Sequence, residues 1–162
     1  MADTRSTETT PLWFVEPSFG ARFAAAFIDG FLLMVLGVVV GLLLLRDDRA
    51  RDLLLPTVAA LYTIGAVAMT GRTFGKRLVG LRVASLSTGA VPDLRAAVIR
   101  WFVPAAPGLL AVVLPRSTPR GLTLALSLAP IVVYFGVVRG PLHRGLHDVF
   151  AGTVVTADPV GV

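Results

Sequence analysis

An acidic residue inside an apolar run is the feature of this sequence that points most directly to chemistry. Asp29 lies in the run 23–45, whose other 22 positions carry no charge. An ionised carboxylate is costly inside a bilayer, so an acid at such a position is by default a functional residue with a polar or charged partner. We therefore expect Asp29 to exchange a proton or respond to an ion.

Arg22 is the nearest basic residue in the sequence, seven positions before Asp29. Seven helical steps of about 100° return to nearly the same face, about 10 Å along the axis. Arg22 would have to extend toward Asp29, or a water or a second basic group would have to bridge them. The alternative is structural: Asp29 anchors helix packing and Arg22 reaches the interface. The sequence leaves both interpretations open.

A glycine- and lysine-containing segment, GRTFGK at 71–76, superficially resembles a phosphate-binding loop. The phosphate loop needs four residues between its glycines and Ser or Thr after the lysine. Here three residues separate Gly71 from Gly75, and Arg77 follows Lys76. We therefore expect no nucleotide at this segment.

Two histidines four residues apart, His143 and His147, have the spacing of a zinc-binding helix. Arg144 stands where that motif requires Glu, and the chain has no cysteine. We expect no metal and no other cofactor, and we expect His147 to form local hydrogen bonds beside Asp148. Since no serine lies in a nucleophile-elbow context, the sequence does not predict an enzyme.

The composition indicates what surrounds these residues. Of the 162 residues, 55% are hydrophobic and 15% are charged, and the mean hydropathy is +0.79. Soluble domains carry about 25% charged residues. A small soluble protein could not bury this much apolar surface because its surface-to-volume ratio is too high. The composition therefore predicts a chain embedded in lipid.

Four charge-poor runs are candidates for spanning helices, since a span needs roughly 20 mainly apolar residues. They predict spans at about 22–45, 53–71, 96–115 and 120–138. The third is the weakest, because Pro104 and Pro107 interrupt it. The predicted fold class is an all-α transmembrane bundle of four helices, or of three helices and one broken helix.

A small β-element is expected beside the bundle. The segment 78–86 and the segment GTVVTADP at 152–159 are both strand-like, and we expect them to pair on the cytoplasmic side. The predicted organisation is a disordered or interfacial N-terminal tail at 1–17, a transmembrane domain at 18–156 and a C-terminal tail at 157–162.

The positions of the basic residues predict the orientation. Ten of the 15 lie on the side of the two termini and the second loop, and five on the other side. Basic loops favour the cytoplasm, so we expect both termini there. Lys76, Arg77 and Arg82 are expected to lie against anionic lipid headgroups. No contiguous basic stripe indicates nucleic acid.

Two pairs of glycines spaced by four residues permit close helix packing, at Gly37 and Gly41 and at Gly136 and Gly140. Packing within the chain is the default interpretation. Association with a second copy or with another membrane protein is the alternative.

Three segments resemble those of a known family. RFAAAFID at 22–29, TFGKRLVGLRV at 73–83 and GLHDVFAGT at 145–153 are similar, in this order, to motifs of the RDD family of small bacterial membrane proteins. The resemblance covers about residues 18–156 and makes Asp148 the candidate second aspartate. It implies a polytopic protein of the bacterial inner membrane, and it suggests transport without assigning a ligand.

Asp148 follows the fourth run, on the predicted side of Arg22. We expect it to pair with Arg22, Arg77 or Arg82 and to hold the C-terminal segment on the first helix. Buried ion pairs specify geometry more surely than they add stability, so a structural clasp is favoured over a transport site.

Two functions follow from these residues. The first is transport of an ion or small ligand, with Asp29 as the responsive group and Arg22 as its electrostatic partner. The second is a non-catalytic membrane scaffold or partner-binding module, in which Arg22, Asp29 and Asp148 hold the fold.

Overall fold

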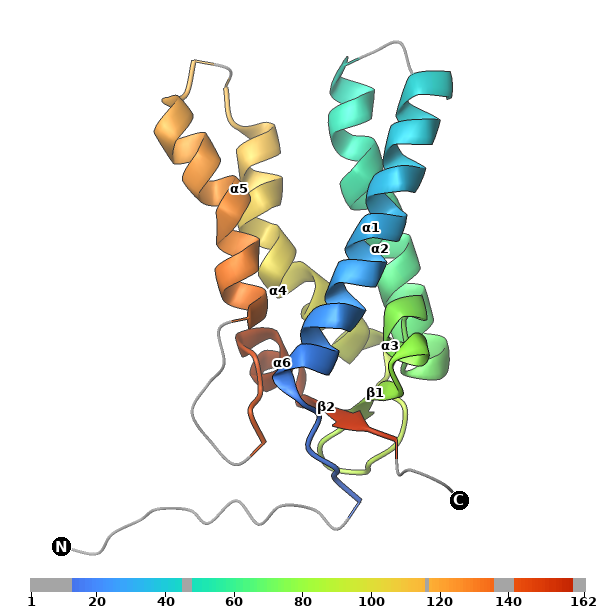
Figure 1. The fold of residues 1–162 in the computed structure, drawn as a ribbon. Helices are drawn as coiled ribbons and strands as arrows, with labels where there is room; N and C mark the ends of the chain where they lie inside the picture. The colour runs from blue at the N-terminus through green and yellow to red at the C-terminus, as the bar shows by residue number, and fades with distance from the viewer. Residues whose placement is uncertain (1–12, 45–47, 116, 136–141, 159–162) are drawn as a thin grey trace, which may run out of the picture.

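The structure is a computed structural model, and it describes residues 13–44, 48–115, 117–135 and 142–158. Six helices and two strands follow one another in these residues (Figure 1). In chain order they are α1 Phe19–Leu44, α2 Asp48–Thr70, α3 Phe74–Leu78, β1 Leu81–Ser85, α4 Leu94–Val113, α5 Arg120–Phe135, α6 Leu146–Ala151 and β2 Thr153–Ala157.

Two helical hairpins form the body of the protein. One pairs α1 with α2, the other pairs α4 with α5, and α2 packs against α4. The hairpins diverge away from a base that contains α3, α6 and the two strands (Figure 1). The predicted class, a mostly helical membrane protein with a small sheet, is confirmed.

In the part of the chain that the structure describes, three helices are long and apolar enough to cross a bilayer, through their segments Phe19–Leu42, Leu53–Thr70 and Leu94–Val113. The prediction that the third run is the weakest was wrong, because α4 continues through both Pro104 and Pro107. Proline removes one backbone hydrogen bond but does not forbid a helix that has packing partners. The apolar segment Arg120–Val133 of α5 is shorter, and residues 136–138 of the expected fourth span lie outside the described residues.

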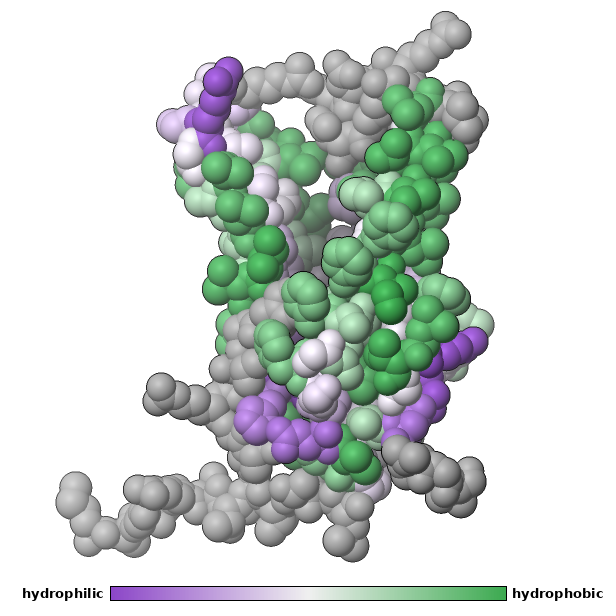
Figure 2. All heavy atoms as spheres, in the orientation of Figure 1, coloured by the Kyte–Doolittle hydropathy of each residue, from purple (hydrophilic) through white to green (hydrophobic). Residues whose placement is uncertain are grey.

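The lipid-facing surface follows from the sequence of α1. Phe19, Phe23, Phe27 and Phe31 recur every four residues and are each more than half exposed. Residues at this spacing share one helix face. Apolar side chains cover the hairpins, whereas hydrophilic ones gather toward the ends of the molecule (Figure 2). A surface of this kind is unfavourable in water and suits the hydrocarbon core of a membrane.

The predicted β-pairing is confirmed. β1 and β2 are antiparallel, with Leu81 opposite Ala157 and Ser85 opposite Thr153. Ala25 of α1 packs with Leu81 and Val155 in one buried cluster. A second cluster of Val67, Val83 and Ala97 joins α2 and α4 to β1. The sheet therefore fixes the bases of both hairpins.

Both ends of the described chain meet at this sheet. The Thr156 hydroxyl accepts from Val15 N at 2.9 Å and donates to Val15 O at 3.0 Å, and Ala157 N donates to the same carbonyl at 2.9 Å. Residues 13–17 of the expected N-terminal tail are thus attached to β2, while residues 1–12 lie outside the described residues. At the other end, Asp158 forms a two-point ion pair with Arg72, at 2.7 and 2.8 Å.

Candidate functional site

The Asp29 carboxylate lies in the interior at the junction of α1, α2 and α3. Asp29 as a whole is only 8% exposed. Oδ1 accepts hydrogen bonds from the Tyr62 hydroxyl and from Gly75 N, both at 2.7 Å. Oδ2 accepts from the Thr73 hydroxyl at 2.5 Å. Three donors from two other elements therefore converge on one buried acid, which offsets much of the cost of its burial.

The short helix α3 reaches Asp29 because Gly75 has no side chain. A Cβ at this position would lie 2.2 Å from the Ala25 carbonyl oxygen and 3.0 Å from Asp29 Cγ. The Tyr62 hydroxyl completes the junction, since it accepts from Phe74 N at 2.7 Å while donating to Asp29. The backbone of α3 thus lies directly on α1, with Asp29 at the contact.

Lys76 lies next to this junction and is buried. The residue is 6% exposed, and its ammonium donates to Thr73 Oγ1 at 3.3 Å. Because the Thr73 hydroxyl donates in turn to Asp29, the lysine and the acid are linked through one hydroxyl. The other two residues of the predicted basic loop differ: Arg77 is exposed, and Arg82 is half-buried with a 3.4 Å hydrogen bond to Gly89 O.

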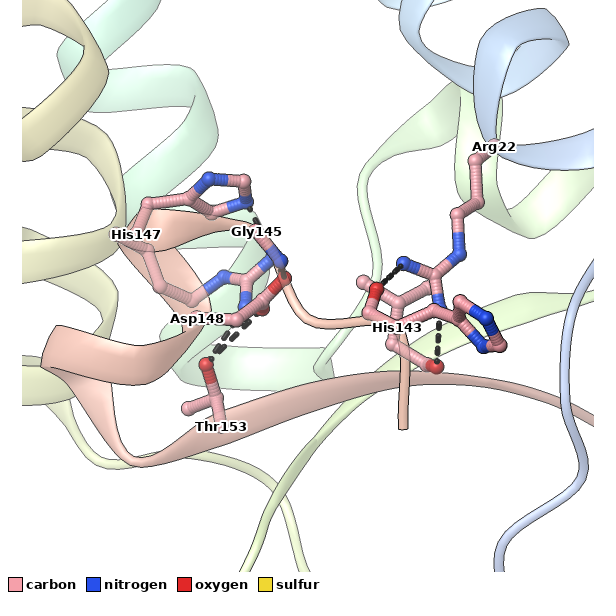
Figure 3. A network of polar contacts seen from close by, with 8 residues as sticks. Arg22, His143, Gly145, His147, Asp148 and Thr153 are labelled. Carbon is pink, nitrogen blue, oxygen red and sulfur yellow. Dashed lines mark hydrogen bonds and ion pairs between the residues drawn. The ribbon is translucent and has the colours of Figure 1, made fainter. Parts of the chain in front are cut away.

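Of the two interpretations that the sequence left open, the contacts of Arg22 support the structural one, and the pairing of Arg22 with Asp29 was wrong. Arg22 donates to His143 O at 2.7 Å and to Val155 O at 3.4 Å (Figure 3). Its side chain joins the start of α1 to β2 and to the segment before α6, which is a structural contact. Neutral hydroxyls and a backbone amide, rather than the arginine, hold the Asp29 carboxylate.

Asp148 forms a second buried junction, which ties α6 to α4. The residue is 1% exposed and forms an ion pair with Arg100, itself 7% exposed. Asp148 also accepts from Gly145 N at 3.2 Å and from the Thr153 hydroxyl at 3.3 Å, and Arg100 donates to that hydroxyl at 2.6 Å (Figure 3).

The expected partner of Asp148 was therefore wrong, although a clasp is present. Asp148 pairs with Arg100 instead of Arg22, Arg77 or Arg82. The clasp holds the C-terminal segment on α4 and not, as expected, on the first helix.

His147 lies beside this clasp. Its Nε2 is 3.5 Å from Asp148 Oδ2, and the residue is 4% exposed. Burial, with a smaller effect from the positive charges of Arg100 and Lys76, lowers the pKa of His147 to about 2. The imidazole is therefore neutral at physiological pH. Among the described residues, no three His, Asp or Glu side chains lie close enough together to hold a metal ion.

A cavity of about 360 Å³ lies in the angle between the two hairpins and reaches Asp29. Asp29, Lys76 and Arg100 line its polar part, with Thr63 and Thr73. The rest of the wall is mainly apolar and includes Leu33, Ala105, Pro130 and Ile131. The surface is hollowed between the hairpins in Figure 2. Both predicted aspartates thus matter here, Asp29 directly and Asp148 through Arg100.

Sequence reasoning missed Tyr62, Thr73 and Arg100 as partners. Tyr62 is a polar ring within an otherwise apolar run, which was an available signal. Arg100 was counted only among the basic residues that set orientation, because it precedes the apolar part of its helix. The pairing itself depends on how four segments meet, and the spacing along the chain does not encode it.

The RDD family model matches residues 16–152 of this chain. No curated protein matches it, and neither does any solved structure.

Proposed function

The chain belongs to the RDD family of membrane proteins, and on this premise we propose that it transports an ion or a small ligand across the bacterial cytoplasmic membrane. The observation that carries the proposal is the cavity between the hairpins, which reaches the buried Asp29 carboxylate. Substrate sites of transporters lie where polar groups and short helices meet within the membrane. A cavity with a buried acid at its base has this character.

In this proposal, protonation of Asp29 would change the shape of the cavity. As a carboxylate it accepts three hydrogen bonds, two of them from the segment that contains Thr73 and Gly75. A protonated carboxyl has one oxygen that donates, so it cannot keep all three acceptor contacts at full strength. Protonation would therefore loosen α3 from α1 and move Lys76, which lines the same cavity.

The orientation we propose places the base of the molecule in the cytoplasm. The N-terminal segment, the second loop and the C-terminal strand all belong to this base (Figure 1). Ten of the 15 basic residues lie on this side in the sequence, as the positive-inside rule favours.

The experiment is flux measurement in proteoliposomes that contain the full chain, with a panel of cations and pH gradients. Asp29→Asn keeps the shape of the side chain but removes its charge and proton exchange, and we expect it to abolish flux. Asp93→Asn is the matched control, because Asp93 is an exposed helix cap and Asn caps helices equally well. Equal flux in wild type and a well-folded Asp29→Asn protein would contradict the mechanism.

A second function has its own support. Both oxygens of Asp29 are already hydrogen-bonded, and the Asp148 clasp is buried and fully engaged. Such contacts also suit a scaffold that binds a membrane partner or a second copy of itself. In that case the wild-type protein would show no flux under any gradient, while Asp29→Asn would lower thermal stability and partner binding together.

A further inference from the structure

Lys76 presents a feature that the Asp29 junction does not use. Its ammonium has three N–H donors, and one of them reaches Thr73 Oγ1. No carboxylate of the described residues lies within 4.0 Å of it to form an ion pair. Yet the residue is 94% buried and lines the cavity between the hairpins. A buried cation with spare donors is costly unless an anionic group approaches it.

The carboxylate nearest in the hydrogen-bond chain does not fill that role. Asp29 is held by Tyr62, Thr73 and Gly75, so both of its oxygens point to other donors. Arg100, the second cation of the cavity wall, is already paired with Asp148. The charge of Lys76 is therefore the one that faces the cavity without direct compensation from the described side chains.

The remainder of the wall indicates what kind of molecule carries the anion. Away from the polar base, the cavity is bounded by Leu33, Ala105, Pro130 and Ile131, and Ile131 is 56% exposed. The surface is hollowed between the hairpins, so the cavity opens there (Figure 2). In a bilayer this opening faces acyl chains. A ligand that enters from the side would meet apolar wall first and the ammonium at the base, so an amphiphile fits better than a fully hydrated ion.

We propose that the cavity binds one anionic phospholipid molecule, with a headgroup phosphate on the Lys76 ammonium and part of an acyl chain along the α4–α5 wall. Lysine binds phosphate as a compact point charge, and its three donors suit phosphate oxygens. The inference deepens the proposed function, since it names a ligand class for the same cavity. It concerns a single buried site and is separate from the diffuse attraction of surface arginines to headgroups.

The test is lipid binding to the delipidated full chain in detergent, followed by native mass spectrometry. Phosphatidylglycerol is titrated against phosphatidylcholine with the same acyl chains. We expect one phosphatidylglycerol per chain to bind at least tenfold more tightly than phosphatidylcholine. Lys76→Gln should weaken this binding about tenfold or more, as expected for loss of a charged hydrogen bond.

Arg77→Gln is the matched control. It removes the same charge from the next residue, whose side chain is exposed and does not line the cavity. We expect the buried site to survive this change, with binding within about twofold of wild type. Equal weakening by Lys76→Gln and Arg77→Gln would show surface attraction alone and would overturn the proposal.

A second variant keeps the test decisive if Lys76→Gln lowers the yield of folded protein. Ala105→Phe leaves Lys76 in place and fills part of the apolar wall, so it should also weaken phosphatidylglycerol binding. Inorganic phosphate is tested alone as a further probe. If it binds as tightly as the lipid, or if Ala105→Phe leaves lipid binding unchanged, the lipid assignment is overturned.

The lipid site and the proposed transport can fail separately. Lipid binding is an equilibrium measurement in detergent and needs no flux. Loss of flux in Asp29→Asn with no bound lipid in wild type would support transport and contradict the lipid site. A bound lipid in a wild-type protein that shows no flux would support the lipid site and contradict the proposed transport.

Discussion

At the scale of single residues, the site depends on two close contacts of Gly75, one with the Ala25 carbonyl and one with the Asp29 carboxylate. Gly75 lets the backbone of α3 reach the Ala25 carbonyl, and Asp29 accepts one hydrogen bond from that backbone, from Gly75 N. The sequence indicated that Asp29 matters, because an acid in an apolar run is unusual. It did not indicate the partners, since Tyr62 and Thr73 are 33 and 44 positions away.

Gly75→Ala should destabilise the protein. Its new Cβ would meet backbone at 2.2 Å, and overpacking of this kind costs about 1–3 kcal/mol or more. Gly65→Ala is the control, because a Cβ at this helical glycine has no neighbour within 4 Å. Thermal unfolding in detergent should give a lower midpoint for Gly75→Ala and an unchanged or higher one for Gly65→Ala. Equal midpoints would contradict the close contact at α3.

His147 should make the folded state less stable in acid. Its folded pKa is about 2 and its ordinary value is 6.5, so below pH 6.5 the unfolded chain binds a proton that the folded protein does not. The contribution of His147 to the free energy of unfolding is complete above pH 6.5. It is lost as the pH falls below this value, by at most about 1.4 kcal/mol per pH unit.

Unfolding measured between pH 7 and 5 tests this dependence. His147→Gln should flatten it, whereas His143→Gln changes an exposed histidine and should leave the His147 contribution in place. An identical pH slope in wild type and His147→Gln would show that His147 does not cause the loss of stability.

At the scale of elements, the predictions succeeded where a pattern is local and failed where it depends on tertiary contacts. The β-branched runs predicted the two strands and their pairing, because alternation and turn residues act within each segment. The prolines of α4 led to the wrong prediction that this span is the weakest. Proline alone weakens a helix, but here neighbouring helices support it. Arg100 clasps α6 from a position that its sequence neighbourhood does not distinguish from an interfacial arginine.

The clasp between α4 and α6 should contribute more to the stability of the fold than the ion pair between Arg72 and Asp158. Asp148→Asn would leave Arg100 buried without its carboxylate, which costs about 3–5 kcal/mol. Asp158→Asn removes a carboxylate that is about one-third exposed and should cost at most about 1 kcal/mol. Thermal unfolding of both variants compares them, and a larger loss in Asp158→Asn would contradict the assigned clasp.

At the scale of the whole molecule, two diverging hairpins on a small shared base leave a cavity at their junction. The composition predicted a membrane chain, and the apolar runs predicted its helices, because burial in lipid requires both. The sequence alone could not predict the cavity, because the residues of its wall come from five helices that meet only in the folded state. The proposed transport belongs to this scale, for it needs the hairpins and Asp29 together.

The most direct test of transport through this cavity uses the absence of native cysteine from the chain. Ala105→Cys places a single thiol on the cavity wall, and Leu124→Cys places one on the exposed surface of α5, outside the lining. Each variant is reconstituted in proteoliposomes, and cation and proton flux are measured before and after a bulky thiol reagent. We expect modification at position 105 to stop flux and modification at position 124 to leave it unchanged. Undiminished flux after complete modification at position 105 would contradict transport through this cavity.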